Sequence, residues 1–302
     1  MGFEKIFILG AGAIGSVYGA FLSKKSDVTL VGNRTHVDAV NSKGLSIIGE
    51  ASRTVRLNAD TAIRSISERV LIILTTKAYD SANAIEGIRT ILRDDTIILI
   101  LQNGLGNEEV VRRIVGRRIK LLRGITAVAA EFSGLGEVRY RLGETVIGQG
   151  KAAADVVAAF KECGLPARLS EDFIRDLWIK LAVNSVVNPL TAIFGVRNSD
   201  IIVDSLADIR YATARECIAV AEAEGIHMRR DLEQAIDKRV VGYSNFSSMC
   251  QDIMRKRRTE IDFLNGKVVE LGKKHHIPTP VNEVLVGFIK YLEGRYGVPR
   301  ED

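Results

Sequence analysis

The chain has 302 residues, of which 46% are hydrophobic and 26% are charged, and its formal net charge is +5. This length suffices for two domains, and the even spread of charge excludes a largely disordered protein. The three cysteines lie far apart and form no CxxC pair. Their spacing excludes a disulfide framework and a zinc site, so we expect no metal.

Membrane and nucleic-acid partners are not expected either. No apolar run reaches the roughly 20 residues of a membrane span, and Glu4 and Lys5 directly precede a strand pattern, which does not fit a signal peptide. Basic clusters such as Arg112–Arg113 lie in helical patterns without interleaved aromatic residues, which favours solvated helix faces. We expect a cytoplasmic protein with a small-molecule partner. The apolar helices expected at 200–225 and 281–296 leave a homodimer open.

Residues 1–171 alternate strand and helix patterns. Apolar runs predict buried strands at 6–9, 28–31, 70–74, 97–101 and 121–127, with helices at 14–23, 81–92 and 108–115. Such an alternation predicts an α/β domain whose parallel sheet is covered on both faces. The glycines of 136–150 predict hairpin strands appended to that sheet.

Residues 172–302 have no comparable strand signal. Helical patterns occupy 173–194, 200–225, 229–241, 247–275 and 281–296. We therefore expect an all-helical C-terminal domain after the α/β domain.

The stretch "KIFILGAGAIGSVYGAFL" places a G-x-G-x-x-G pattern between a strand and a helix. Gly10 permits a tight turn, Gly12 lets the backbone approach a pyrophosphate, and Gly15 lets the helix pack on the strand. The first turn of the helix presents free N–H groups to the anion. The sequence thus predicts a Rossmann-type dinucleotide site formed by Gly10, Ala11, Gly12, Ala13, Ile14 and Gly15.

The second strand indicates which dinucleotide binds. An NAD site usually has Asp or Glu about 20 residues after the loop, whereas this strand ends in Asn33 and Arg34. A guanidinium can pair with a 2′-phosphate, so Arg34 favours NADP. The alternative is that Arg34 is an ordinary exposed loop residue.

Two further polar residues follow predicted strands. Lys77 comes after 70–74 and Asn103 after 97–101. In open α/β sheets the ligand crevice lies outside the carboxyl ends of the strands. We expect both residues to contact the cofactor, although either could instead satisfy backbone groups of its own loop.

The helix predicted at 173–194 carries a polar stripe. Lys180, Asn184 and Asn188 recur every four residues and lie within about 80° of one another on the helix. Apolar neighbours flank the stripe, which suits the wall of a polar pocket. A solvent-facing stripe is the alternative, but Glu and Lys would be commoner there than Asn. Pro189 should kink the helix beside this site.

Five sequence motifs of this chain occur in the same order and at the same spacing as in one known protein family. The chain resembles the ketopantoate reductases (2-dehydropantoate 2-reductases) over nearly its whole length. The resemblance rests on the motifs "GAGAIG", "TTKAYD", "QNGLG", "KLAVNSVVNPLTAI" and "SSMCQD…TEIDFLNG".

The resemblance implies a role for each matching residue. Lys180 would be the general acid, and Glu260 the acidic residue that works beside the lysine and the cofactor. Lys77, Asn103 and Ala129 would contact the cofactor. The implied substrate contacts are Asn103, Lys180, Asn184, Asn188, Asn198 and Ser248.

The implied reaction is the NADPH-dependent reduction of ketopantoate to (R)-pantoate, in pantothenate and coenzyme A biosynthesis. A carboxylate such as Glu260 would help to keep Lys180 protonated. Ser248 and Glu260 would lie about 18 Å apart on one unbroken helix, so we expect Ser248 at or before the start of the helix. The alternatives are a paralogous reductase of another 2-keto acid and a non-catalytic NADP-binding sensor.

Overall fold

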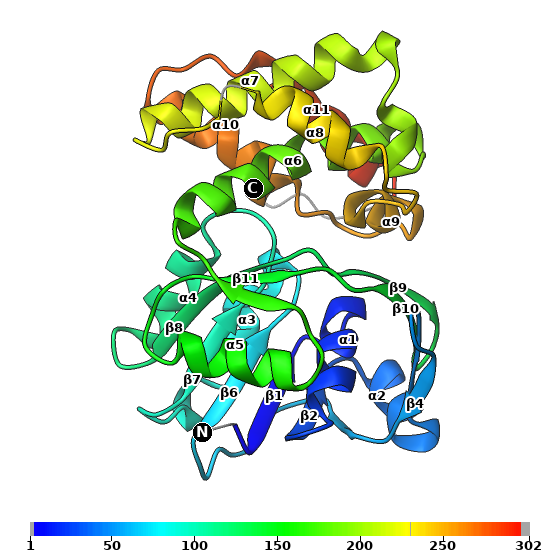
Figure 1. The fold of residues 1–302 in the computed structure, drawn as a ribbon, viewed down its shortest axis with the longest axis vertical. Coiled ribbons are helices and arrows are strands. Elements are labelled where there is room, and N and C mark those ends of the chain that lie inside the picture. The colour runs from blue at the N-terminus through cyan, green and yellow to red at the C-terminus, as the bar shows by residue number, and fades with distance from the viewer. Residues whose placement is uncertain (1–2, 230, 297–302) are drawn as a thin grey trace. The chain divides into compact units, whose positions relative to one another are not determined.

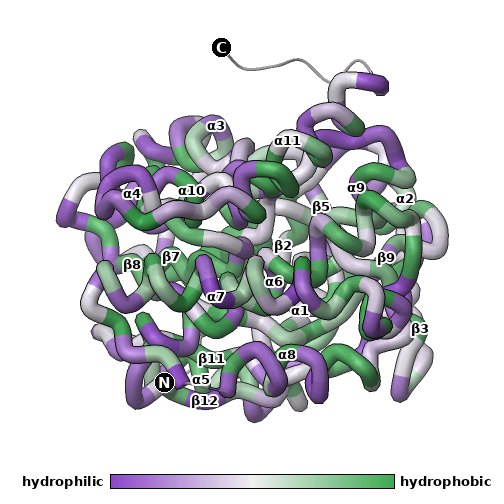
Figure 2. Tube along the Cα trace, turned by 90° about the horizontal axis from the view of Figure 1, so that it is seen from above, coloured by the Kyte–Doolittle hydropathy of each residue, from purple (hydrophilic) through white to green (hydrophobic). Residues whose placement is uncertain are grey.

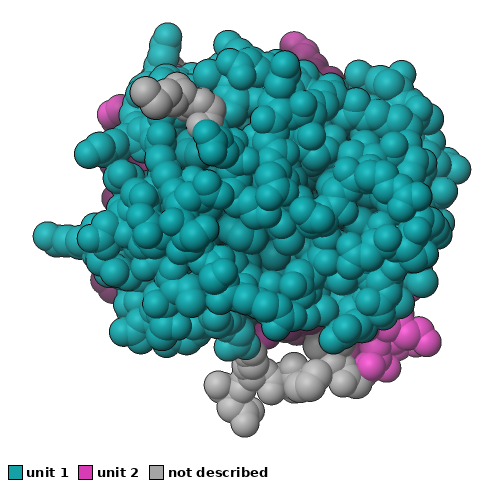
Figure 3. All heavy atoms as spheres, turned by 90° about the horizontal axis from the view of Figure 1, so that it is seen from below, with its two compact units in different colours: residues 1–102, 107–173 teal, residues 103–106, 174–302 magenta. Residues whose placement is uncertain are grey.

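The structure is a computed structural model that describes residues 3–229 and 231–296. The chain divides into two compact units, which Figure 3 colours separately. Unit 1 holds residues 1–102 and 107–173, and unit 2 holds residues 103–106 and 174–302. The short segment 103–106 therefore belongs with the C-terminal helices.

Unit 1 is built on an eight-stranded sheet of order β12-β11-β8-β7-β6-β1-β2-β5 (Figure 1). Its bounds are β1 Lys5–Leu9, β2 Asp27–Val31, β5 Asn58–Asp60, β6 Val70–Leu74, β7 Ile97–Ile100, β8 Lys120–Thr126, β11 Thr145–Ile147 and β12 Ala167–Leu169. The strands from β8 to β5 pair in parallel, whereas β11 runs antiparallel to β8. The predicted α/β fold and its five buried strands are confirmed.

A second, four-stranded sheet has the order β4-β3-β10-β9. Its strands are β3 Leu45–Ile48, β4 Arg53–Val55, β9 Ala129–Gly134 and β10 Glu137–Arg141. The expectation that 136–150 adds a hairpin to the main sheet is wrong in part. Only β11 joins that sheet, because β10 pairs with β9 and β3 instead.

Helices cover both faces of the main sheet. One face packs on α1 (Ala13–Leu22) and α5 (Ala153–Glu162), with Val17 and Phe160 in its core. The opposite face packs on α3 (Ser81–Glu86) and α4 (Asn107–Val115). The remaining helix is α2, Arg34–Lys43, and the short 3-10 helices are η1 Ala78–Asp80 and η2 Arg89–Ile91. The helix predicted at 81–92 therefore ends early, at Glu86.

In the described residues of unit 2, every secondary-structure element is a helix. Its elements are α6 Phe173–Phe194, η3 Asn198–Ile201, η4 Asp204–Leu206, α7 Ala207–Ala223, α8 Leu232–Val240, α9 Ser248–Met254, η5 Ile261–Phe263, α10 Asn265–Lys274 and α11 Pro280–Gly294. The helix predicted at 247–275 is wrong, since it is broken into α9, η5 and α10. The helix predicted at 200–225 begins only at Ala207, after two 3-10 turns.

Helix α6 runs through Pro189 without a break in its assignment. Proline has no N–H, so it cannot bond to the carbonyl of Ser185, four residues earlier. The buried amide of Asn265 fills that gap, because its Nδ2 donates to the Ser185 oxygen at 2.9 Å and to Asn282 Oδ1 at 2.9 Å. A side chain of α10 thus supplies the hydrogen bond that Pro189 cannot make to the Ser185 carbonyl.

Helix α6 has the length and composition of a membrane span, but 72% of its apolar window is buried within the protein. Among its buried residues are Trp178, Leu181, Val186 and Leu190, which belong to one hydrophobic cluster with side chains of α7 to α11. This burial is that of a core helix.

Candidate active site

The glycine loop has the geometry of a phosphate-binding turn. Gly10 has φ +114°, and a Cβ there would lie 2.3 Å from the backbone nitrogen of Thr76. A Cβ at Gly15 would lie 2.3 Å from the Gly10 oxygen. The Thr75 hydroxyl donates to that same oxygen at 2.7 Å, which fixes the loop to the end of β6. Both glycines are therefore required by the fold itself.

Gly12 differs from these two glycines. It is the N-cap of α1, and a Cβ built on it would meet nothing within 4 Å. The space beside the Gly12 backbone is therefore open, and the first N–H groups of a helix have no partner within the helix. Open space at Gly12, next to the N–H groups that begin α1, fits the approach of a pyrophosphate.

Asn33 and Arg34 lie at the start of α2. Asn33 caps this helix, since its Oδ1 accepts a hydrogen bond from the N–H of His36 at 3.0 Å. Burial lowers the pKa of His36, whose ring packs beside Ser16 of α1. Arg34 is exposed. Its guanidinium has no hydrogen bond or ion pair with any described residue, so it is available to a ligand.

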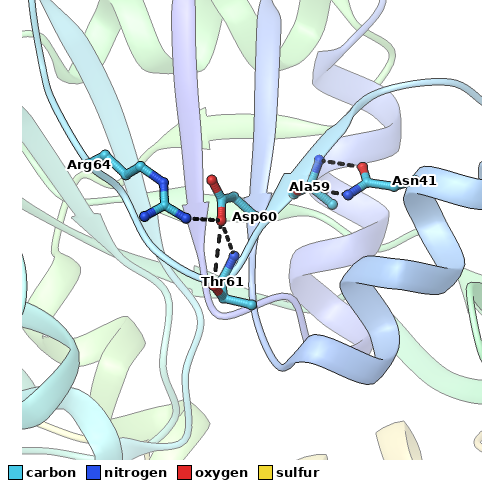
Figure 4. A network of polar contacts seen from close by, with 5 residues as sticks. All are labelled: Asn41, Ala59, Asp60, Thr61 and Arg64. Carbon is cyan, nitrogen blue, oxygen red and sulfur yellow. Dashed lines mark hydrogen bonds and ion pairs between the residues drawn. The ribbon is translucent and has the colours of Figure 1, made fainter.

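One carboxylate near the carboxyl end of β2 is absent from the residues predicted from the sequence. Asp60 ends β5 in register with Val31 of β2. Figure 4 shows the contacts of its carboxylate with Thr61 and Arg64. The Thr61 N–H and the Arg64 guanidinium both donate to Asp60 Oδ1, at 2.6 and 3.2 Å. These contacts, chiefly the Thr61 N–H, hold the pKa of Asp60 below its usual value. The three-residue strand that carries it is too short to give a sequence signal.

Two other predicted cofactor contacts lie in unit 1. Lys77 is half-buried and caps η1, directly after the Thr76 backbone that Gly10 approaches. Ala129 begins β9 and pairs with Arg141 in the smaller sheet.

In unit 2 the structure brings together three predicted residues from distant parts of the sequence. Asn184 Nδ2 lies 3.4 Å from Asn103 Oδ1, and Asn103 Nδ2 lies 3.5 Å from Glu260 Oε2. Asn184 and Glu260 are both buried. Asn103 therefore links a helix α6 amide to a buried carboxylate through two long hydrogen bonds.

The glycine of "QNGLG" explains how segment 103–106 reaches this place. Gly104 has φ +82°, and a Cβ on it would lie 2.2 Å from the Phe263 carbonyl oxygen. The next residue, Leu105, donates its N–H to the same oxygen at 3.1 Å. Only glycine permits so close a backbone contact.

Lys180 is half-buried on α6, one turn before Asn184. Burial, with repulsion from Arg239 of α8, lowers the pKa of Lys180 to about 8. We expected a carboxylate to keep this lysine charged, but both effects that shift its pKa favour the neutral amine. The shift places its titration near neutral pH, as a proton donor requires.

The remaining predicted substrate contacts lie on α6, η3 and α9. Asn188 and Asn198 are buried, and Asn198 Oδ1 has no hydrogen-bond partner among the described residues. Ser248 is the first residue of α9, and Ser247 caps that helix by accepting the Cys250 N–H at 3.0 Å. The expected position of Ser248 at a helix start is confirmed.

The break between α9 and α10 resolves the spacing problem of Ser248 and Glu260. Glu260 is not on a helix with Ser248 but caps η5, after the turn that follows Met254. The buried Thr259 beside it donates its N–H to Glu293 Oε1 at 2.6 Å. The 18 Å separation expected for one straight helix therefore does not apply.

The glycine loop at the end of β1 and the helical unit with its buried amides define a two-unit dinucleotide-binding protein of the oxidoreductase type. The family model described as "Ketopantoate reductase PanE/ApbA" matches residues 6–152, and "Ketopantoate reductase PanE/ApbA C terminal" matches 172–293. The chain belongs to the ketopantoate reductase PanE/ApbA family.

Individual relatives agree with this assignment. The chain is 38% identical to 2-dehydropantoate 2-reductase of Pyrococcus horikoshii, over 97% of this chain and 99% of that protein. A PanE/ApbA family ketopantoate reductase from Ralstonia eutropha JMP134 has a similar structure, with a TM-score of 0.90 and 30% identity over 97% and 99% of the two chains. D-mandelate dehydrogenase, solved with NADH and anilino(oxo)acetate, has a TM-score of 0.89 and 26% identity over 97% and 100%.

Proposed function

We propose that this protein reduces ketopantoate (2-dehydropantoate) to (R)-pantoate with NADPH, in pantothenate and coenzyme A biosynthesis. The observation that carries the proposal is the composition of α6, where a lysine with a pKa of about 8 shares one helix face with two buried asparagines. The names of the curated relatives support the substrate.

The amides and the hydroxyl of unit 2 suit a 2-keto acid. Asn188, Asn198 and Ser248 offer donors for a carboxylate and for a distal hydroxyl. The unpartnered Asn198 Oδ1 is a buried acceptor. An unsatisfied buried acceptor is costly, and the hydroxyl of ketopantoate would satisfy it. Fixing the acid at both ends orients its carbonyl for reaction.

Lys180 supplies the proton. NADPH, held at the glycine loop, would provide the hydride that reduces the carbonyl carbon. As negative charge develops on the carbonyl oxygen, the Lys180 ammonium donates a proton to it and becomes the neutral amine. At pH 7, one unit below a pKa of about 8, roughly nine in ten molecules carry the ammonium. Asn103 joins Asn184 to Glu260 and holds these groups in place.

Arg34 supports NADPH over NADH. Its exposed guanidinium can pair with a 2′-phosphate through two parallel hydrogen bonds. The nearby Asp60 carboxylate is bonded to Arg64, which offsets its repulsion of that phosphate.

The test is steady-state oxidation of NADPH and NADH with ketopantoate and a panel of other 2-keto acids. We expect turnover with ketopantoate and NADPH to exceed every other combination. Binding of NADPH without turnover of any keto acid would contradict the enzyme proposal and favour a sensor.

The likeness to D-mandelate dehydrogenase supports a second candidate, a reductase of a 2-keto acid with an aromatic side chain. Its structure holds NADH and anilino(oxo)acetate and aligns with 97% of this chain. Oxidising mandelate at its CH–OH group gives an aromatic 2-keto acid, so phenylglyoxylate belongs in the panel. Preference for it would move the protein to this paralogous activity without changing the mechanism.

We also propose that the protein is a cytoplasmic homodimer. All three cysteines are free and buried, which fits a reducing compartment.

The dimer proposal rests on helix α11. This helix exposes Val284, Phe288 and Tyr291 by 50%, 52% and 64%, at the spacing of one helix face. Figure 2 shows the mixed hydropathy along this helix. Glu283 lies near one end of this face, and Arg295 caps the other. Antiparallel pairing with a second copy would bring these opposite charges together.

A further inference from the structure

Gln102 follows β7 and is buried, with 6% of its surface exposed. Its Nε2 lies 2.9 Å from the Thr76 carbonyl oxygen, 2.9 Å from the Thr76 hydroxyl, 3.3 Å from the Lys77 carbonyl oxygen and 2.7 Å from Ser81 Oγ. Two of these partners are carbonyls, which only accept, so the nitrogen of the amide must face them. One side-chain amide thus holds the whole turn between β6 and α3.

The opposite end of this turn is also held. Ser81 Oγ donates to the Ala78 carbonyl at 2.7 Å, so it can accept a hydrogen from Gln102. Lys77 lies between these contacts as the cap of η1. The backbone that carries the Lys77 side chain is therefore bonded on both sides of that residue.

Gln102 is itself fixed by a buried arginine. Arg123 of β8 is 7% exposed, and its Nη2 donates to the Gln102 carbonyl at 2.6 Å. Its Nη1 donates to the Ile100 carbonyl at 3.0 Å. A planar guanidinium that bonds two carbonyls on the end of β7 fixes the direction of the Gln102 backbone.

We propose that Gln102 is a positioning residue for the cofactor: it orients Lys77, and so sets the affinity for NADPH, by clamping the Thr76–Ser81 turn. This inference rests on the proposed NADPH binding but not on the identity of the keto acid. The amide oxygen, Oε1, is buried and has no hydrogen-bond partner within residues 3–229 and 231–296. The Gln102 amide therefore contacts the turn through its nitrogen alone.

The test is a double-mutant cycle between Gln102→Met and Lys77→Met, read as the Kd for NADPH from its fluorescence. Methionine has a similar volume to glutamine but has no N–H group. The Thr76 and Lys77 carbonyls therefore lose the hydrogen bonds that they accept from Gln102 Nε2. We expect Gln102→Met to weaken NADPH binding roughly tenfold, and to have no further effect in the Lys77→Met background. Gln149→Met is the matched control, since that amide donates to Ser170, and it should leave the Kd unchanged.

Equal weakening by Gln102→Met in both backgrounds, or no weakening in either, would overturn the proposal. If Gln102→Met does not fold, Ser81→Ala removes one partner of the same amide, and the same comparison with Lys77→Met decides. NADPH binding is measured without substrate. A wild-type protein that binds NADPH but reduces no keto acid would therefore refute the proposed function, while the double-mutant cycle could still be measured.

Discussion

At the scale of single residues, burial sets the proton affinity of Lys180. Its pKa of about 8 lies below the usual 10.5 because burial and Arg239 both disfavour the ammonium. The acid form donates the proton, so activity belongs to pH values below this pKa and is lost above it. We expect kcat/KM for the keto acid to fall tenfold per pH unit above about pH 8.

The matched variant for this prediction is Lys180→Ala. It should reduce kcat by about 10²–10⁴-fold and remove the alkaline limb, with the Kd for NADPH unchanged. A wild-type profile that stays flat to about pH 10 would show that another group donates the proton.

Arg34 makes a separate prediction at this scale. Replacing Arg34 by alanine removes a charge-assisted partner for the 2′-phosphate, which is worth about 1.5–3 kcal/mol. We expect the Kd for NADPH to rise roughly 10- to 100-fold and the Kd for NADH to stay within twofold. Arg89→Ala is the control, because Arg89 is also exposed and pairs with Glu86. Equal losses for both cofactors would contradict a role in choosing NADPH.

At the scale of elements, the glycines of the loop have two different roles. Gly10 and Gly15 are required for folding, whereas Gly12 leaves space for a ligand. A Cβ at Gly12 meets nothing within 4 Å, whereas one at Gly15 lies 2.3 Å from a backbone oxygen. Gly12→Ala should therefore change the free energy of unfolding by less than about 1 kcal/mol and weaken NADPH binding at least tenfold. Gly15→Ala should lower the free energy of unfolding by about 1–3 kcal/mol.

Denaturant unfolding and NADPH fluorescence check both variants. If Gly12→Ala binds NADPH normally, the open space at Gly12 does not hold the pyrophosphate.

The elements that the sequence predicts well are those with strong local signals. The bounds of α6 agree at both ends, and the apolar runs of β1, β6 and β7 each fall within one residue of the strands. The three-residue strands β4, β5 and β12 carry too few residues for a period, and partners far along the chain define them. The break after Met254 was missed because its charged residues also fit an exposed helix face.

The candidate site also has parts that the sequence predicts and parts that it does not. Motif order located Lys180, Asn184 and Glu260, and the structure links two of them through Asn103. The lowered pKa of Lys180 and the clamp formed by Gln102 depend on three-dimensional surroundings, so spacing could not reveal them.

At the scale of the whole molecule, the exposed face of α11 predicts association. Monomeric proteins seldom expose neighbouring large apolar side chains on one face without a partner. We expect light scattering after gel filtration to give the mass of a dimer, and Phe288→Glu to halve it. Val241→Glu is the control, since Val241 is 60% exposed outside this face. A monomeric wild type, or a dimer that persists in Phe288→Glu, would refute the α11 interface.

The bond between Asn265 and Ser185 has a consequence for synthesis of the chain. The carbonyl that Pro189 leaves open on α6 finds its donor 80 residues later. At about 5–20 residues per second, the ribosome needs roughly 4 to 16 seconds to add that stretch. Until then the Ser185 carbonyl of a nascent α6 lacks its hydrogen-bond donor, Asn265. The helix also exposes its apolar faces, because the helices that bury them have not been made. The helix bearing Lys180 is thus among the first parts of its unit to be synthesised and among the last to be completed.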